Sequence, residues 1–71
     1  MNDHAAAIRE YEALLAREPD DVPARYQLGL SYAATGRKGD AITQLGRALQ
    51  IDSDGNRTSE MRKKLEQIQA Q

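Results

Sequence analysis

The residue types that could catalyse a reaction or bind a metal ion are few and scattered in this 71-residue chain. His4, the only histidine, lies near the start with no cysteine and no fixed acid beside it, so we expect a solvent-exposed or packing role. Asp52 and Asp54 lack the spaced oxygen ligands and the final glutamate of a calcium loop. The sequence therefore predicts no enzyme active site, no metal site and no bound cofactor.

The segment Gly36-Arg-Lys-Gly-Asp40 is rich in glycine and basic residues, as phosphate-binding loops often are. It matches neither the nucleotide-binding loop nor the dinucleotide fingerprint, and no strand is expected before it. We interpret it as a turn between two helices.

One group of basic side chains near the end of the chain could in principle contact nucleic acid; it comprises Arg57, Arg62, Lys63 and Lys64, opposed by Glu60. No aromatic residue is interleaved to stack on bases, and the net charge of the whole chain is −1. We therefore expect a solvated helix face and no nucleic-acid partner.

The composition also limits the compartment and the fold class. The longest apolar run is far shorter than a membrane span, and the first residues lack the pattern of a signal peptide. With no cysteine there is no disulfide framework. Alanine, leucine and long straight-chain polar residues dominate, and these favour helix. We expect one soluble, cytoplasmic, all-α domain over residues 1–71 that does not bind membranes.

Breakers and capping residues divide the chain into four expected helices. Asp3 should cap the first helix, which Pro19 ends, and Asp20 or Asp21 should cap the second. The third is expected from about Lys38 to Ile51, and the fourth from Thr58 or Ser59, after the turn over residues 52–56.

The first and third helices carry the same apolar stripe with a constant offset of 34 residues, the mark of an internal repeat. The matching pairs are Ala7 with Ala41, Ile8 with Ile42, Tyr11 with Leu45, Leu14 with Ala48, and Leu15 with Leu49.

Period and residues together resemble the tetratricopeptide repeat, a helix-turn-helix unit of 34 residues. The matching positions are Leu28, Gly29 and Tyr32 of the first helix of a repeat, Ala41 and Leu45 of the second, and the closing Pro19. Arg25 stands where tryptophan is usual, and Ser53 where the closing proline is usual. The resemblance implies an α-solenoid: residues 2–21 as the second half of a repeat, 22–55 as a complete repeat, and 56–71 as a capping helix.

Gly29 and Ala41 are expected where the two helices of a repeat cross, because small residues there allow close approach. In the fourth helix, Arg62 and Lys63 replace the Leu-Gly pair, so no further repeat begins in the usual way. A shift of one residue places Met61 and Leu65 at the leucine and tyrosine positions, as a solenoid cap requires.

The resemblance implies a protein–protein interaction module whose concave groove holds a peptide or a partner helix. The family's groove positions fall on Tyr26, Gln27, Leu30, Ala33 and Ala34, with Glu60, Lys63 and Lys64 of the cap bordering them. Tyr26 and Leu30 could equally pack against the next helix. Chaperone-tail binders of this family use basic residues and asparagine at these sites, so we expect a mostly apolar ligand or a helix.

The alternative is self-assembly. Met1 falls just before a turn within a repeat, so the first repeat lacks its first helix, and part of Ile8 and Tyr11 should be exposed. An upstream helix of a longer chain, or a second copy in a homodimer, would then cover Ala7, Ile8 and Tyr11.

Overall fold

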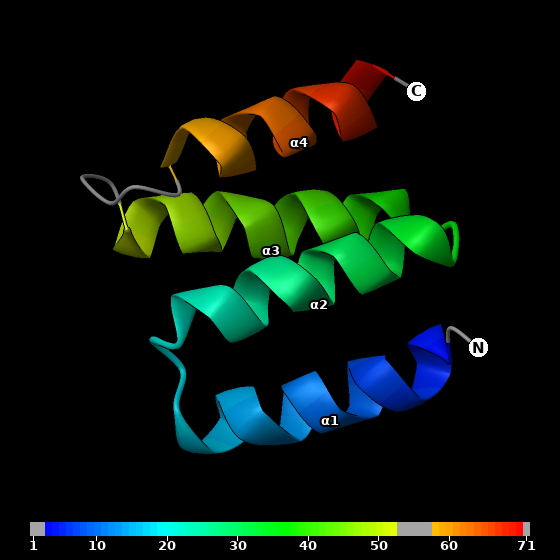
Figure 1. The fold of residues 1–71 in the computed structure, drawn as a ribbon, viewed down its shortest axis with the longest axis vertical. Helices are drawn as coiled ribbons and strands as arrows, with labels where there is room; N and C mark the ends of the chain where they lie inside the picture. The colour runs from blue at the N-terminus through cyan, green and yellow to red at the C-terminus, as the bar shows by residue number, and fades with distance from the viewer. Residues whose placement is uncertain (1–2, 53–57, 71) are drawn as a thin grey trace.

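A computed structural model describes residues 3–52 and 58–70, and this part of the chain forms four helices and no strand. They are α1 (His4–Arg17), α2 (Val22–Ala34), α3 (Lys38–Ile51) and α4 (Thr58–Ala70). Successive helices run antiparallel and stack in chain order (Figure 1). The all-α prediction of antiparallel helix-turn-helix units is confirmed.

Side chains at the helix ends fix the boundaries. Asp3 Oδ1 accepts a hydrogen bond from Ala6 N at 3.0 Å, and Asp21 Oδ1 accepts one from Ala24 N at 3.0 Å. Of the two candidate caps of α2, Asp21 is therefore the one used. Gly36, just after α2, has φ +83°, a conformation that glycine adopts without strain and that turns the chain into α3.

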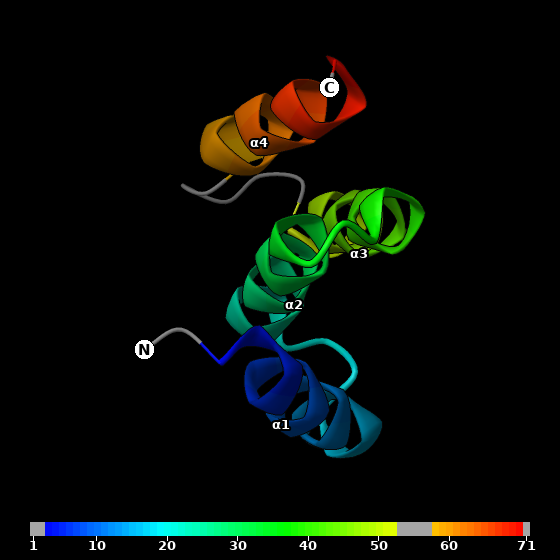
Figure 2. The ribbon, with the colours of Figure 1, turned by 90° about the vertical axis from the view of Figure 1, so that its right-hand side faces the viewer.

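The core is a single apolar layer running through the stack. Its most buried large side chains are Leu28, Leu45 and Met61. α2 packs closely on α3, with Gly29 and Ala41 at their crossing. Figure 2 shows that α3 lies to one side of α2 and α4, so that these two helices border the same side of the molecule.

Arg25, at the position where the family usually has tryptophan, ties the α1–α2 turn to α3. Its guanidinium donates hydrogen bonds to Pro19 O at 2.7 Å and to Gln44 Oε1 at 2.8 Å. The side chain therefore connects three segments by hydrogen bonds in place of the packing that a large aromatic ring would provide.

α4 is packed on one side and charged on the other. Met61 and Ile68 are buried and Leu65 is partly buried, whereas Arg62 is exposed. When Met61 is aligned with Leu28, and Leu65 with Tyr32, Arg62 corresponds to Gly29. The outer face of α4 thus carries a long cation where a helix of the repeat needs its smallest residue.

Within the described ranges, no helix is long and apolar enough to cross a lipid bilayer. The expectations for Ser53, Asp54 and the rest of the turn before α4, and for Arg57, fall on residues outside the described ranges.

Candidate protein-binding surface

An open pocket of about 260 Å³ lies between α2 and α4. Tyr26 of α2 lines one side. The other side is formed by α4 residues at i, i+3, i+4 and i+7, which share one helix face: Glu60, Lys63, Lys64 and Gln67. Tyr26 is partly buried and packs against the core, so its position is fixed, while the α4 side chains are exposed. The pocket thus combines one partly buried aromatic ring with a wall of exposed polar side chains.

Tyr26 supplies a hydrogen-bond donor at this pocket. Burial, and after it the negative charge of Glu60, raise the pKa of the Tyr26 phenol above its ordinary value of 10.0. The hydroxyl therefore remains protonated at neutral pH. An amphipathic ring of this kind, apolar in its body and polar at its tip, is the residue type enriched at protein interfaces.

The structure brings together Tyr26, Lys63 and Lys64 of the predicted groove, with Glu60 beside them. The remaining predicted groove residues do not line the pocket: Gln27 and Ala34 are exposed, and Leu30 and Ala33 are partly buried. Gln67 was missed, although it follows Lys63 by four residues on the predicted fourth helix, and this spacing could have identified it.

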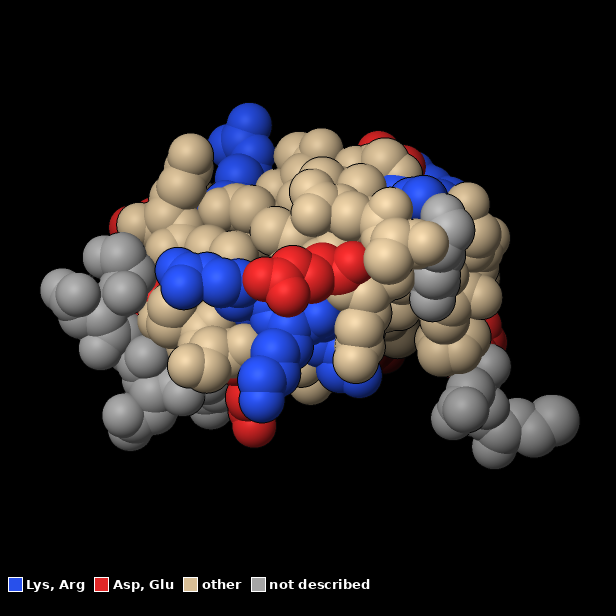
Figure 3. Space-filling model, turned by 90° about the horizontal axis from the view of Figure 1, so that it is seen from above, with Lys and Arg blue, Asp and Glu red and all other residues tan. Residues whose placement is uncertain are grey.

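The face of the molecule on the α4 side carries basic side chains close to acidic ones (Figure 3). Its exposed charged residues on α4 are Glu60, Arg62, Lys63, Lys64 and Glu66. Because both signs are mixed, this face does not present the uniform positive field expected of a nucleic-acid surface.

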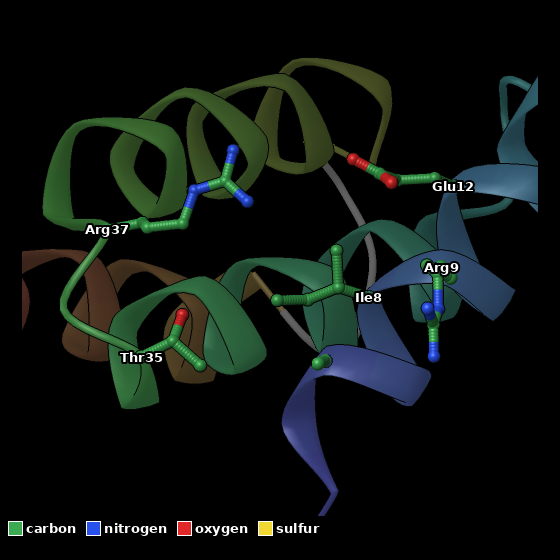
Figure 4. A pocket seen from close by; sticks show the side chains of 6 residues that line it. Ile8, Arg9, Glu12, Thr35 and Arg37 are labelled. Carbon is green, nitrogen blue, oxygen red and sulfur yellow. The ribbon is translucent and has the colours of Figure 1, made fainter.

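A second pocket of about 360 Å³ lies between α1 and the α2–α3 turn (Figure 4). It is lined by Ala5, Ile8, Arg9, Glu12, Thr35 and Arg37. Most of its polar groups already have partners within the chain. Tyr32 Oη donates to Glu12 Oε2 at 2.6 Å, and the Arg37 guanidinium lies 4.3 Å from the centre of the Tyr32 ring.

Arg37 also forms an ion pair with Asp40, with Nη2 2.8 Å from Oδ2, and Thr35 Oγ1 donates to Ser31 O and Tyr32 O. These contacts connect α1, α2 and the start of α3. We therefore interpret the second pocket as a structural junction, and the pocket between α2 and α4 as the candidate binding site.

The apolar stripe of α1 divides into two halves. Ile8 and Leu15 are buried, whereas Ala7, Tyr11 and Leu14 are only partly buried. The expectation that Ile8 would be partly exposed is wrong, because Ile8 lies in the buried half, in the core cluster, and is only 7% exposed. Tyr11 is partly exposed, as expected.

The equivalent residues of α3 show the opposite pattern. Ala41, Leu45 and Ala48, which match Ala7, Tyr11 and Leu14, are 0% exposed, while Ile42 and Leu49 are partly buried. On α3 the fully buried half lies against α2, as the contact of Gly29 with Leu45 and Ala41 shows. The strip Ala7–Tyr11–Leu14 of α1 is thus the half that no described helix covers in the same way.

Over residues 3–52 and 58–70, no group of three or more acidic or histidine side chains is arranged to hold a metal ion. This includes the short acidic turn between α1 and α2, where Glu18, Asp20 and Asp21 border a shallow open pocket.

Comparison with known proteins adds one finding to this geometry. No curated protein and no solved structure matches the chain significantly. The family model described as tetratricopeptide repeat matches residues 1–56, which is most of the chain and includes α1, α2 and α3. The chain therefore belongs to the tetratricopeptide repeat family.

Proposed function

We propose that the chain binds a peptide or a helix of a partner protein on the side of the molecule bordered by α2 and α4. Tetratricopeptide repeats generally mediate protein–protein interaction and are typically non-catalytic. We accordingly propose an adaptor or scaffold role without enzymatic activity, with residues 2–21 as a half repeat, 22–55 as a complete repeat and 56–71 as the cap.

The pocket formed by Tyr26, Lys63, Lys64 and Gln67 carries this proposal. Tyr26 offers a fixed ring against which an apolar side chain can pack, and Leu30, four residues later, extends the same helix face. The ligand we propose is mostly apolar over Tyr26 and Leu30, with polar groups meeting the two lysines at the edge.

Selection from a phage-displayed library of random peptides, followed by fluorescence titration of the selected peptides, tests this function. Tyr26→Ala should weaken binding about tenfold or more, as truncation of a central aromatic residue usually does. Ile51→Ala is the matched control, because Ile51 is 41% exposed and does not line the pocket. Peptides that bind wild type and Tyr26→Ala equally would overturn the assignment of this site.

A second candidate function is self-association, and one observation favours it. Ala7, Tyr11 and Leu14 form a partly exposed apolar strip on α1, whereas the equivalent strip on α3 is fully buried. We propose this strip as a self-association surface, with Ile8 contributing only through the core beneath it.

A further inference from the structure

We propose that two copies of the chain associate through α1 in an antiparallel pair, with Ala7 of each copy packed against the partner subunit's Leu14. This inference rests on the self-association proposed above and adds the orientation and the register of the two helices.

The internal repeat indicates which kind of element could cover the Ala7–Tyr11–Leu14 strip, because α3 shows how the equivalent residues are covered. On α3, the matching residues Ala41 and Leu45 are covered by α2, a helix that runs antiparallel to α3 (Figure 1). Leu45 there faces Gly29, so a large side chain meets a small one. A helix that covers the α1 strip in the same way would run antiparallel to α1. It would place a small residue opposite each large residue of the strip.

α1 itself meets this requirement. Ala7 and Leu14 are seven residues apart, two turns of helix, and therefore lie on the same side of α1. In an antiparallel pair related by a two-fold axis, Ala7 meets the partner subunit's Leu14, and Leu14 meets the partner subunit's Ala7. The same register places Glu10 of each copy close to the two-fold axis.

Charge selects the antiparallel direction. Asp3, Glu10 and Arg17 also follow one another at intervals of seven and lie along one edge of the strip. An antiparallel pair places Arg17 near the partner subunit's Asp3 at both ends, and only the two Glu10 carboxylates, close to the two-fold axis, meet as like charges. A parallel pair would place like charges together at all three positions. Arg17 is exposed and has no hydrogen bond or ion pair with any residue that the structure describes, so its charge is available.

The other end of the molecule cannot supply the covering helix in the same way. Arg62 of α4 stands at the position that corresponds to Gly29 of α2, and a charged side chain there prevents the close approach that Gly29 allows. Compared with α4, the α1 helix of a second copy thus complements the strip better in both size and charge.

Sedimentation equilibrium of the full chain from low to high micromolar concentration tests for the dimer. We expect a reversible dimer whose dissociation constant rises about tenfold or more in Tyr11→Glu. Ala13→Glu is the matched control, because Ala13 is exposed on the opposite face of α1 and carries the same charge change. Arg17→Glu, a surface substitution that leaves the packed strip intact, should weaken the dimer in the same direction.

Cysteine cross-linking tests the orientation, since the chain has no cysteine of its own. Glu10→Cys lies close to the two-fold axis and should form a disulfide-linked dimer under mild oxidation. Arg17→Cys should not, because in an antiparallel pair the two thiols lie about 20 Å apart at 1.5 Å per residue. Equal cross-linking by Arg17→Cys would overturn the antiparallel register while leaving self-association intact. A folded monomer at every concentration, as expected if another protein or a preceding helix covers the strip, would overturn both.

Discussion

A Cβ atom built on Gly29 would lie 2.9 Å from Cγ of Leu45, closer than real Cβ contacts come. The same atom would lie 3.4 Å from the backbone oxygen of Ala41. Glycine in the middle of α2 costs about 0.5–1 kcal/mol of helix stability relative to alanine. The contact between α2 and α3 compensates for that cost, because it lets the fully buried Leu45 pack directly against the backbone of α2.

We therefore predict that Gly29→Leu lowers the free energy of unfolding by more than the ~1–3 kcal/mol usual for overpacking, since the added side chain meets backbone as well as Leu45. Thermal unfolding followed by circular dichroism measures the change. Gly46 is the matched control, because nothing lies within 4 Å of a Cβ built there. Gly46→Ala should stabilise the protein by about 0.5–1 kcal/mol. A melting curve of Gly29→Leu that matches wild type would contradict the close crossing.

The hydrogen bond from Tyr32 to Glu12 connects α2 with α1 and is 2.6 Å long. Tyr32→Phe should lower the free energy of unfolding by about 1 kcal/mol, the usual net value of such a bond. Glu12→Gln retains a hydrogen-bond acceptor, so it should lower the free energy of unfolding by less than Tyr32→Phe does. Urea unfolding of the three proteins at neutral pH compares them, and equal stability of wild type and Tyr32→Phe would show that the bond contributes nothing.

Stability should also decrease at alkaline pH. Burial, and after it the hydrogen bond to Glu12, raise the pKa of Tyr32 above its ordinary value of 10.0. The folded state then keeps this proton at pH values where the unfolded chain has lost it. The stabilisation is complete below pH 10 and is lost as the pH rises through the folded-state pKa. Urea titrations on both sides of this pH should show a smaller decrease in Tyr32→Phe than in wild type; identical decreases would contradict the prediction.

A chaperone C-terminal peptide should show no saturable binding in the low micromolar range. Such peptides are held through their carboxylates by basic residues on the first helices of repeats, and here Tyr26, Gln27 and Leu30 occupy those positions of α2. Isothermal titration with the acidic peptide, beside a peptide selected for binding, provides the comparison. Clear saturation by the acidic peptide would contradict the expectation of a mostly apolar ligand.

Most of the fold follows from local signals in the sequence. Asp3 and Gly36 mark helix ends through their own hydrogen bonding and backbone freedom, so both are recognisable without tertiary information. Gly29 is recognisable as a helix-crossing residue, because a glycine interrupts a stretch that otherwise favours helix. Tyr26 and Lys63, which line the candidate pocket, stand at positions that the family resemblance places in or beside its groove.

The sequence pattern does not reveal which residues of an apolar stripe a neighbouring helix buries and which it leaves partly exposed. Ile8 and Tyr11 belong to the same stripe of α1, yet Ile8 is buried and Tyr11 is partly exposed. The difference depends on the direction from which α2 approaches α1, and hydrophobic periodicity carries no such direction. For the same reason, the pocket includes Tyr26 but not Gln27, its neighbour in the chain.

Arg62 gives the two ends of the stack different properties. α1 presents an apolar strip, whereas α4 presents an exposed guanidinium at the position where close helix packing needs glycine. An open-ended filament requires two different surfaces of one molecule that fit each other. In a two-fold pair, the same surface of each copy is buried against the other, so the assembly closes at two copies. Under the association through α1 proposed above, the α4 side carries Arg62 where close packing needs a small residue. We therefore expect association to stop at two copies, giving discrete dimers rather than fibres at high concentration.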